Sequence, residues 1–358
     1  MADGNVFTTT RPASLNAPSA SPQRSQRALL HAAGIAAGVG LVLVGTMVAS
    51  DAHGLLRTAL VVGGLYALVA GVSGVLQHVT GRAFDITPWL CGAWLAVIAL
   101  TAALADVLPL AEARNPARAL DTPALLRPDL LSKHPLGTDR QGLDMLGELI
   151  FGARVSLVIG IGAVTFGLLV GGSAGLVAGY RRGRLDSVAG IVNDTLLSFP
   201  PLILLLALVA VLGPNVRNVT IALGILSVPT YFRLVRANSI AYANREFVMV
   251  ARALGAPHRR IIFRELLPNV APVAVSYSLL MGAVVIVAEA SLSYLGLSVQ
   301  RPDPTWGNLI SSGEADYRHN PHLVAAPGIV LFATVYSLNR LGEAARRRWD
   351  PRTNQLAA

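Results

Sequence analysis

Apolar residues occupy most of the chain in long runs, and short polar segments rich in arginine separate these runs. A helix that crosses a bilayer needs roughly 20 mainly apolar residues, and about eight runs reach that length. They cover residues 28–50, 55–77, 88–110, 155–179, 187–212, 219–235, 272–297 and 322–341. The pattern therefore predicts an all-α integral membrane protein, with three N-terminal spans followed by a core of five.

The polar segments divide the chain into regions. Residues 1–27 are rich in Ser, Pro, Thr and Ala and are predicted to form a disordered cytoplasmic tail rather than a signal peptide. The three N-terminal spans lie in 28–110, and a hydrophilic extracytoplasmic segment covers 111–153. The five-span core covers 154–346 and contains a long polar loop at 237–268, and residues 347–358 form a second cytoplasmic tail.

Composition supports a membrane protein. Only 14% of the residues are charged and 53% are hydrophobic, whereas a soluble domain has roughly 25% charged residues. This balance argues against a soluble enzyme and against a disordered chain. The net charge of +9 comes with apolar spans, which favours contact with anionic lipid over nucleic acid. Cys91 is the single cysteine, so no intrachain disulfide can form.

The distribution of basic residues predicts the orientation. With the N-terminus in the cytoplasm and every run crossing, most basic residues fall on the cytoplasmic side, as the positive-inside rule requires. The loop at 181–184, the loop at 237–268 and the C-terminus are then cytoplasmic. The segment 111–153 is extracytoplasmic, and there acidic residues accompany the basic ones.

The loop at 237–268 contains a short amphipathic helix. Its apolar residues recur at helical spacing, and they are Phe247, Val250, Ala251 and Leu254. Arg245, Glu246 and Arg252 lie off that stripe. Gly255 and Pro257 are predicted to end the helix, with Gly255 in a left-handed conformation. A second short helix over 259–267 leads to Leu267-Pro268. Periodicity alone leaves open a helix that lies on the lipid surface.

Several motifs in the second half of the chain resemble those of a known family. The spacing of Ala251, Gly255 and Leu267-Pro268 is similar to the EAA loop of ABC-importer permeases, although the triplet here reads Met249-Val250-Ala251. The stretches 134–142, 151–157, 196–200, 289–296 and 304–308 resemble the dipeptide/oligopeptide/nickel permease family, in its C-type subunit. The resemblance covers residues 134–352 and implies a type I ABC-importer transmembrane fold.

The resemblance implies a permease subunit of an ATP-driven, binding-protein-dependent importer of peptides in the prokaryotic inner membrane. Its partners would be a second permease, two ATPase subunits and an extracytoplasmic substrate-binding protein. Nickel chelate or glutathione is an alternative cargo. The chain lacks a P-loop, so ATP and Mg²⁺ are expected on the ATPase subunits and no cofactor on this chain. The residues expected to couple to the ATPase are Arg245, Glu246, Phe247, Val250, Ala251, Leu254, Gly255, Leu267 and Pro268.

Polar residues and prolines within the spans are candidates for the translocation path or its gate, because ionisable groups in a bilayer are costly. They are Asp194, Ser198, Pro200 and Glu289. Pro200-Pro201 is predicted to interrupt its span, and Asp194 is expected to have no basic partner in a neighbouring span. A proton-coupled secondary carrier, with these carboxylates as relays, is the alternative. Trp306 and Asn308 are expected to contact the binding protein.

Residues 171–175 match the G-x-S-x-G pattern of serine hydrolases. However, every histidine of the chain lies at a span end or in a loop. Gly167, Gly171, Gly175 and Gly179 recur every four residues, which is typical of close packing between membrane helices. We therefore interpret the glycines as a packing face and predict no catalytic and no metal-binding residue.

Overall fold

The structure is a computed structural model, and it describes residues 33–34, 36–41, 64, 67, 86–129 and 132–349. The chain divides into two units, Met1–Ile86 and Thr87–Ala358. The tail 1–27 lies outside the described residues, as do most of the spans predicted at 28–50 and 55–77 and the tail 347–358 beyond Trp349. The second unit contains the whole of the predicted five-span core.

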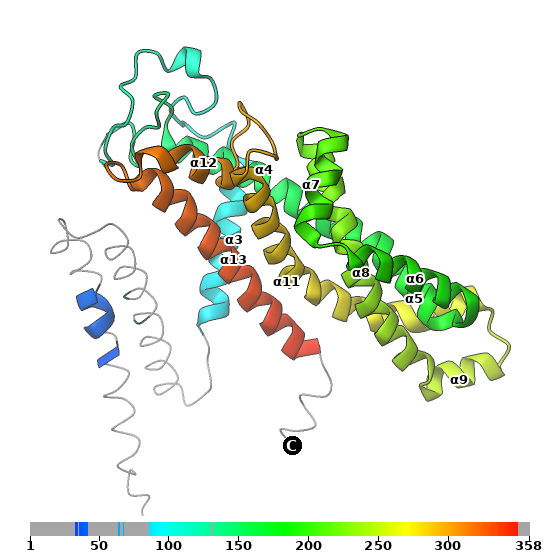
Figure 1. Cartoon of the computed structure of the whole chain (residues 1–358). Coiled ribbons are helices and arrows are strands. Elements are labelled where there is room, and N and C mark those ends of the chain that lie inside the picture. Colours follow the sequence, from blue (N-terminus) through cyan, green and yellow to red (C-terminus); the bar gives the residue numbers. More distant parts are fainter. Residues whose placement is uncertain are drawn as a thin grey trace, which may run out of the picture. The chain divides into compact units, whose positions relative to one another are not determined.

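The described regular elements of the second unit are helices (Figure 1). The α-helices are α3 (Thr87–Ala103), α4 (Met145–Gly167), α5 (Ser173–Arg181), α6 (Gly183–Ser198), α7 (Pro201–Leu212), α8 (Val216–Ala243), α9 (Glu246–Ala253), α10 (His258–Arg260), α11 (Leu267–Tyr294), α12 (Trp306–Gly313) and α13 (His322–Trp349). Two π-helical segments, η4 (Leu168–Gly172) and η5 (Ile261–Leu266), join α4 to α5 and α10 to α11. Short 3₁₀ turns are η3 (Pro116–Arg118) and η6 (Glu314–Asp316).

Four helical stretches are long and apolar enough to cross a membrane, namely Met145–Arg181, Val216–Ala243, His258–Tyr294 and His322–Arg348. The pair Gly183–Ser198 and Pro201–Leu212 makes a fifth if it counts as one broken span. The all-helical prediction is confirmed for the described residues. These stretches coincide with the five runs predicted for the core, although α4 begins at Met145, well before the expected start at residue 155.

The predicted interruption at Pro200-Pro201 is confirmed. Helix α6 ends at Ser198, α7 begins at Pro201, and the two meet at an angle of 91°. Neither proline has a backbone N–H to donate, and a residue before proline is driven out of the helical region. Phe199 is accordingly extended, with φ −83° and ψ 136°.

The second short helix of the polar loop was predicted to end at Leu267-Pro268, and this was wrong. Helical structure runs without a break from His258 to Tyr294. Pro268 lies in the first turn of α11, where a missing N–H costs least, and the wider π turn η5 precedes it. The polar loop therefore passes directly into a membrane-length helix.

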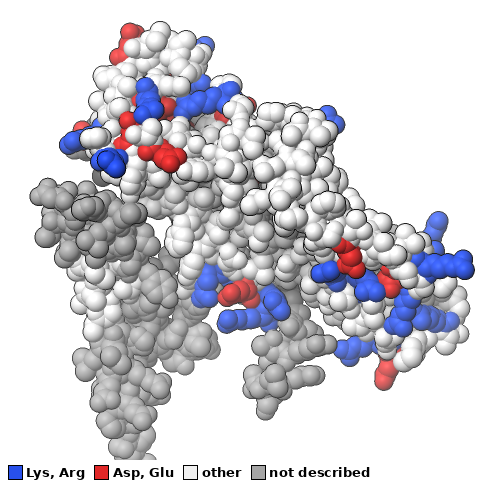
Figure 2. Space-filling model, viewed as in Figure 1, with Lys and Arg blue, Asp and Glu red and all other residues white. Residues whose placement is uncertain are grey.

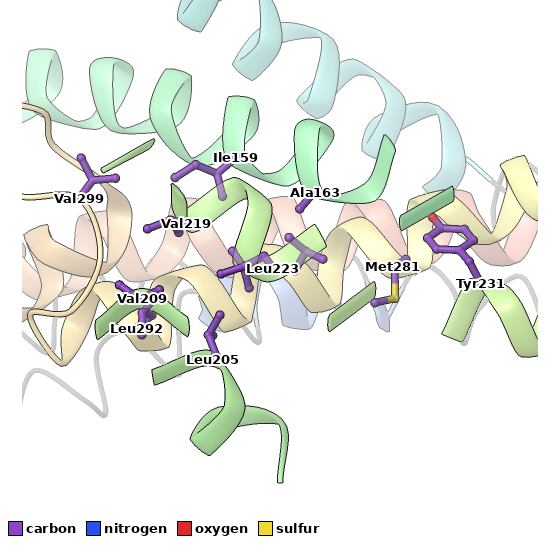
Figure 3. Close-up of a cluster of buried hydrophobic side chains, with 12 residues drawn as sticks. Ile159, Ala163, Leu205, Val209, Val219, Leu223, Tyr231, Met281, Leu292 and Val299 are labelled. Atoms are coloured by element: carbon purple, nitrogen blue, oxygen red, sulfur yellow. The ribbon is translucent and has the colours of Figure 1, made fainter. Parts of the chain in front are cut away.

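A core of apolar side chains holds the helices together (Figure 3). Ile159 and Ala163 come from α4, Val219 and Leu223 from α8, and Met281 from α11. Leu205 and Val209 extend the cluster to α7, so the broken helix pair is anchored through its second half. Figure 2 shows that charged side chains on the visible face gather towards opposite ends of the described helices, with uncharged surface between them.

Candidate functional site

The exposed face of α9 is the first feature that could bind a partner protein. Val248 is fully buried and packs with Ile261 and Leu266 of η5. Four apolar side chains are exposed, by 39 to 82%: Phe247, Met249, Val250 and Leu254. We call these four the exposed apolar face of α9. Because α9 buries a face on its own chain, it is held in place while the exposed apolar face remains open.

The ends of α9 have defined geometry. Gly255 has φ +77°, so its predicted left-handed conformation is confirmed. The Gly255 N–H donates to the Arg252 carbonyl at 2.9 Å and the Ala256 N–H to the Ala251 carbonyl at 3.0 Å. Ala251 is half-buried, whereas Arg245, Glu246, Leu267 and Pro268 are exposed beside it. The residues expected to couple to an ATPase thus lie in or next to α9 and at the start of α11. All of them are exposed except Ala251, which is half-buried.

Polar and aromatic side chains attach α9 to α5, and of these only Arg252 was singled out from the sequence. The Arg252 guanidinium lies over the Tyr180 ring, 4.9 Å from its centroid. The Tyr180 hydroxyl is 2.9 Å from Nδ1 of His258, at the start of α10. Arg182 Nη2 donates to Asn244 Oδ1 at 3.0 Å, just before α9 begins. Three contacts therefore connect the segment from Asn244 to His258, which contains α9, to the end of α5 and the turn that follows it.

Asp194 was expected to lack a basic partner in a neighbouring span, and this was wrong. Arg233 Nη2 of α8 donates to Asp194 Oδ1 at 2.9 Å. Closer to the α9 end, Arg236 makes two hydrogen bonds to Asp186, at 2.5 and 2.7 Å. Two arginines three residues apart in an apolar helix need acidic partners, and this was the signal that could have predicted both pairs.

An apolar groove of about 210 Å³ lies beside the α6–α7 break. Leu197 and Phe199 line it at the end of α6, Leu223 comes from α8, and Met281 and Ala288 from α11. The candidate gating residues Asp194, Ser198, Pro200 and Glu289 are not among its lining residues. Ser198 donates to the Thr195 carbonyl of its own helix at 2.7 Å, and Pro200 is exposed at the break itself.

Glu289 is fully buried near the end of α11. It accepts hydrogen bonds from Ser156 of α4 at 3.1 Å and from Ser298, beyond α11, at 3.4 Å. In this conformation its carboxyl group joins α4, α11 and the loop that leads to α12. The side chain does not face an open path, so its present contacts are those of a structural residue.

Trp306 was expected to contact a binding protein, but its side chain is fully buried and Nε1 donates to the Leu149 carbonyl at 3.2 Å. It is a core residue in this structure. Asn308 is half-buried and forms a capping box with Thr305: the Thr305 N–H donates to Asn308 Oδ1 at 2.9 Å. Both residues therefore fix the start of α12 in this structure.

The motif at 134–142 builds a buried ionic network with the loop after α11. Arg301 Nη2 lies 3.0 Å from Asp139 Oδ2 and 3.1 Å from Glu148 Oε1. Asp144 accepts from the Gly147 N–H at 2.8 Å, which caps α4, and its other oxygen is 3.0 Å from His134 Nδ1. We call residues 104–129 and 132–148 together with 295–305 the cap.

The four glycines of the predicted packing face all lie against α8. A Cβ added at Gly171 would lie 2.3 Å from the Val228 carbonyl oxygen, and one at Gly175 would lie 2.6 Å from that of Phe232. Gly167 and Gly179 are equally close to α8. Ser173, within the G-x-S-x-G pattern, donates to the Val170 carbonyl of its own helix at 3.1 Å.

Comparison with known proteins identifies the family. Residues 167–355 match the model described as "Binding-protein-dependent transport system inner membrane component". The chain is 37% identical over 222 residues to the glutathione transport system permease protein GsiD of Pectobacterium atrosepticum, with 62% of this chain and 73% of the relative covered. It is 37% identical over 239 residues to the dipeptide transport system permease protein DppC of Alkalihalophilus pseudofirmus, with 66% and 76% covered.

A solved structure of the inward-facing MetNI methionine ABC transporter is also similar, with a TM-score of 0.49, 18% identity, and 57% of this chain and 98% of that chain covered. The family model spans more than half of the present sequence and includes α9, the α6–α7 break and the glycine face. The chain is therefore a multi-pass membrane protein and a transport permease subunit that belongs to the family of binding-protein-dependent transport system inner membrane components.

Proposed function

We propose that this chain is one of two permease subunits of an ATP-driven importer of peptides, and that α9 is its docking element for an ATPase subunit. The observation that carries the proposal is the exposed apolar face of α9. Four apolar side chains are exposed at an end of the molecule where charged side chains gather, and the rest of the described chain does not cover them. Such a patch is typical of a protein–protein contact.

The proposal assigns each partner a task. The second permease forms the translocation path with this chain, and an extracytoplasmic binding protein delivers the cargo. Two ATPase subunits bind ATP and Mg²⁺. The cargo class is supported by the similar permeases, which are named for dipeptide, for di- and tripeptide and for glutathione transport. Glutathione, itself a small peptide, falls within the proposed class.

Docking of α9 requires that the end of the molecule that carries α9 faces the cytoplasm, and the arginines support this orientation. Arg245, Arg252, Arg259, Arg260 and Arg264 all belong to this one segment. A cysteine introduced at Gly183 should be protected from an impermeant thiol reagent in intact cells, whereas one at Thr122 of the cap should react. Labelling of both positions from outside would overturn the orientation and with it the proposed dock.

The docking surface is tested by Leu254→Asp. Leu254 is 82% exposed in the isolated chain, so the change should leave folding intact. In a desolvated interface the unpaired carboxylate costs several kcal/mol, and about 1.4 kcal/mol corresponds to a tenfold loss of affinity. We expect the amount of ATPase recovered with the tagged permease to fall about tenfold or more. The rate of peptide uptake should fall with it.

Leu120→Asp is the matched control, because Leu120 is also 82% exposed but lies in the cap. It introduces the same charge at the other end of the molecule and should leave ATPase recovery at the wild-type level. Equal recovery with Leu254→Asp, Leu120→Asp and the wild type would show that α9 is not the dock.

A further inference from the structure

Helix α6 is weakly packed for an element of a membrane core. Only Asn193 of its residues is buried, and the apolar side chains Leu185, Val188 and Ile191 are exposed by more than half. Packing alone therefore does not determine where α6 lies on α8. Other contacts must do so within the described part of the chain.

Three polar contacts connect α6 and its first turn to α8. They pair Arg182 with Asn244, Asp186 with Arg236, and Asp194 with Arg233. As the residue numbers rise along α6, those of the partners fall along α8, so the contacts form a ladder between antiparallel helices. We call these three pairs the α6–α8 ladder. Its middle rung is bidentate, which is the strongest geometry for such a pair.

The first rung, between Arg182 and Asn244, lies directly before α9. Asn244 is the cap residue of α8, and α9 begins at Glu246, so a displacement of α9 displaces Asn244 as well. Arg182, its partner, has φ +54°, a conformation that a residue with a side chain seldom adopts. Gly183 follows with φ +68°. The turn between α5 and α6 thus has an unusual backbone conformation. A contact to the C-terminal end of α8, just before α9, holds it in place.

The far end of α6 borders the groove. The last residues of the helix, Leu196 and Leu197, line the groove together with Phe199 at the break. Helix α5 cannot follow a movement of α6 easily, because Gly175 and Gly179 hold it directly against the backbone of α8. The two ends of α6 are therefore its adjustable points, one at Arg182-Gly183 and the other at Phe199-Pro200.

We propose that the α6–α8 ladder transmits displacement of the α9 segment to α6 and to the break beside the groove, so that Asp186 and Arg236 are positioning residues for transport. The inference rests on the proposed function, since it assumes that an ATPase moves α9. It assigns the Asp186–Arg236 pair a role that neither docking nor ATP hydrolysis requires. Loss of the pair should therefore uncouple hydrolysis from uptake.

The test uses the complete importer, with both permeases, the ATPases and the binding protein, reconstituted in liposomes. Asp186→Arg, Arg236→Asp and the double charge swap are compared with wild type for ATPase recovery, ATP hydrolysis and uptake of labelled peptide. Coupling between distant sites typically amounts to about 5–150-fold. We expect each single variant to retain ATPase recovery and hydrolysis but to lose about fivefold or more of its uptake per ATP. The double swap should restore uptake.

Arg182→Ala is the second variant. Its side chain is exposed, so its removal does not disturb the core, and it should reduce uptake per ATP in the same direction, by less than the Asp186 change. If the charge variants of Asp186 and Arg236 are not inserted into the membrane, the uptake per ATP of Arg182→Ala alone tests the ladder. Unchanged uptake per ATP in Arg182→Ala, or loss in the single variants without rescue by the swap, would overturn the ladder. Failure of the wild-type permease to recover any ATPase would instead contradict the proposed function.

Discussion

The two ends of the second unit handle charge and apolar surface in different ways. At the cap, Arg301, Asp139 and Glu148 pair with one another inside the chain, and the carboxylate side chains are no more than 8% exposed. In the α6–α8 ladder, which begins beside α9, Asp194 and Arg233 pair in the open, with side chains 68 and 61% exposed. Apolar side chains are exposed at both ends, Leu120 at the cap and Leu254 at α9, but only on α9 do four of them form the exposed apolar face defined above.

This difference indicates which end the chain completes by itself. A buried ion pair must find its partners within the fold, because an unpaired buried charge is costly. The cap meets that condition with residues of this chain alone. The described chain does not cover the exposed apolar face of α9, and the proposed ATPase partner would cover it. The cap is thus held by contacts within this chain, whereas the proposed function assigns a partner to the α9 end.

The contrast between the two ends requires that the stability of the cap depends on its buried ionic network. Arg301→Leu tests this dependence. The change leaves Asp139 and Glu148 buried without their cation. Removal of one partner from a buried pair costs about 3–5 kcal/mol. Since the Arg301 side chain is 33% exposed, we expect the lower part of that range, about 3 kcal/mol, measured as a fall in the thermal unfolding midpoint of the purified permease.

The second-site change Glu148→Gln in the Arg301→Leu background is the control. It replaces one of the two carboxyl groups left without Arg301 by a neutral amide and should recover part of the lost stability. A midpoint for Arg301→Leu equal to that of the wild type would mean that the cap is held by its apolar contacts, and the contrast between the two ends would then rest on α9 alone.

A smaller loss is expected on disturbing the packing between α5 and α8. A Cβ at Gly175 would lie 2.6 Å from the Phe232 carbonyl oxygen and 3.0 Å from the Arg236 amide nitrogen. Because backbone atoms cannot move aside, Gly175→Ala should cost about 1–3 kcal/mol. The matched change Gly190→Ala in α6 meets no atom within 4 Å and should be neutral or slightly stabilising, by up to about 1 kcal/mol.

The unfolding midpoints of the two alanine variants provide the measurement, and the yield of assembled complex provides a second one. Equal midpoints would show that α5 can separate from α8 without loss. In that case the ladder, and not the glycine face, would determine how α6 is positioned.

Features with a strong local cause could be predicted from the sequence. Length and hydropathy determine the spans of the core, Pro200-Pro201 determines the α6–α7 break, and Gly255 determines the end of α9. Each of these depends on residues close together in the chain. The continuous helix through Leu267-Pro268 was missed because a proline in the first turn does not end a helix.

Features that depend on tertiary contact could not be predicted in this way. Val248 was overlooked because the apolar stripe was assigned to a single face, whereas α9 has one buried and one exposed apolar face. Arg301 lies 162 positions from Asp139 in the chain, and only the fold brings them together. Trp306 occurs in a loop-like motif, and its burial results from the packing of α12 against α4 and α11.

The smallest effect is expected from an exposed ion pair at the cap, between Arg140 and Asp316 of η6. The Arg140 guanidinium lowers the pKa of the Asp316 carboxyl below its usual 3.8, by hydrogen bonding first and by its charge second. A carboxyl group with a lowered pKa adds stability above its unfolded-state pKa, and this is lost as the pH falls through the folded value. Arg140→Gln should therefore lower the unfolding midpoint slightly at neutral pH and not at all in acid below both values.

High salt should remove the same small difference at neutral pH, because solvent screens an exposed pair. Unfolding midpoints of wild type and Arg140→Gln, in low and high salt, provide the measurement. The Arg301 network should respond less to salt, since its carboxyl groups are buried. If Arg140→Gln instead cost as much as Arg301→Leu and resisted salt, the ionic network of the cap would extend to η6. The cap would then include the α12–η6 segment as well.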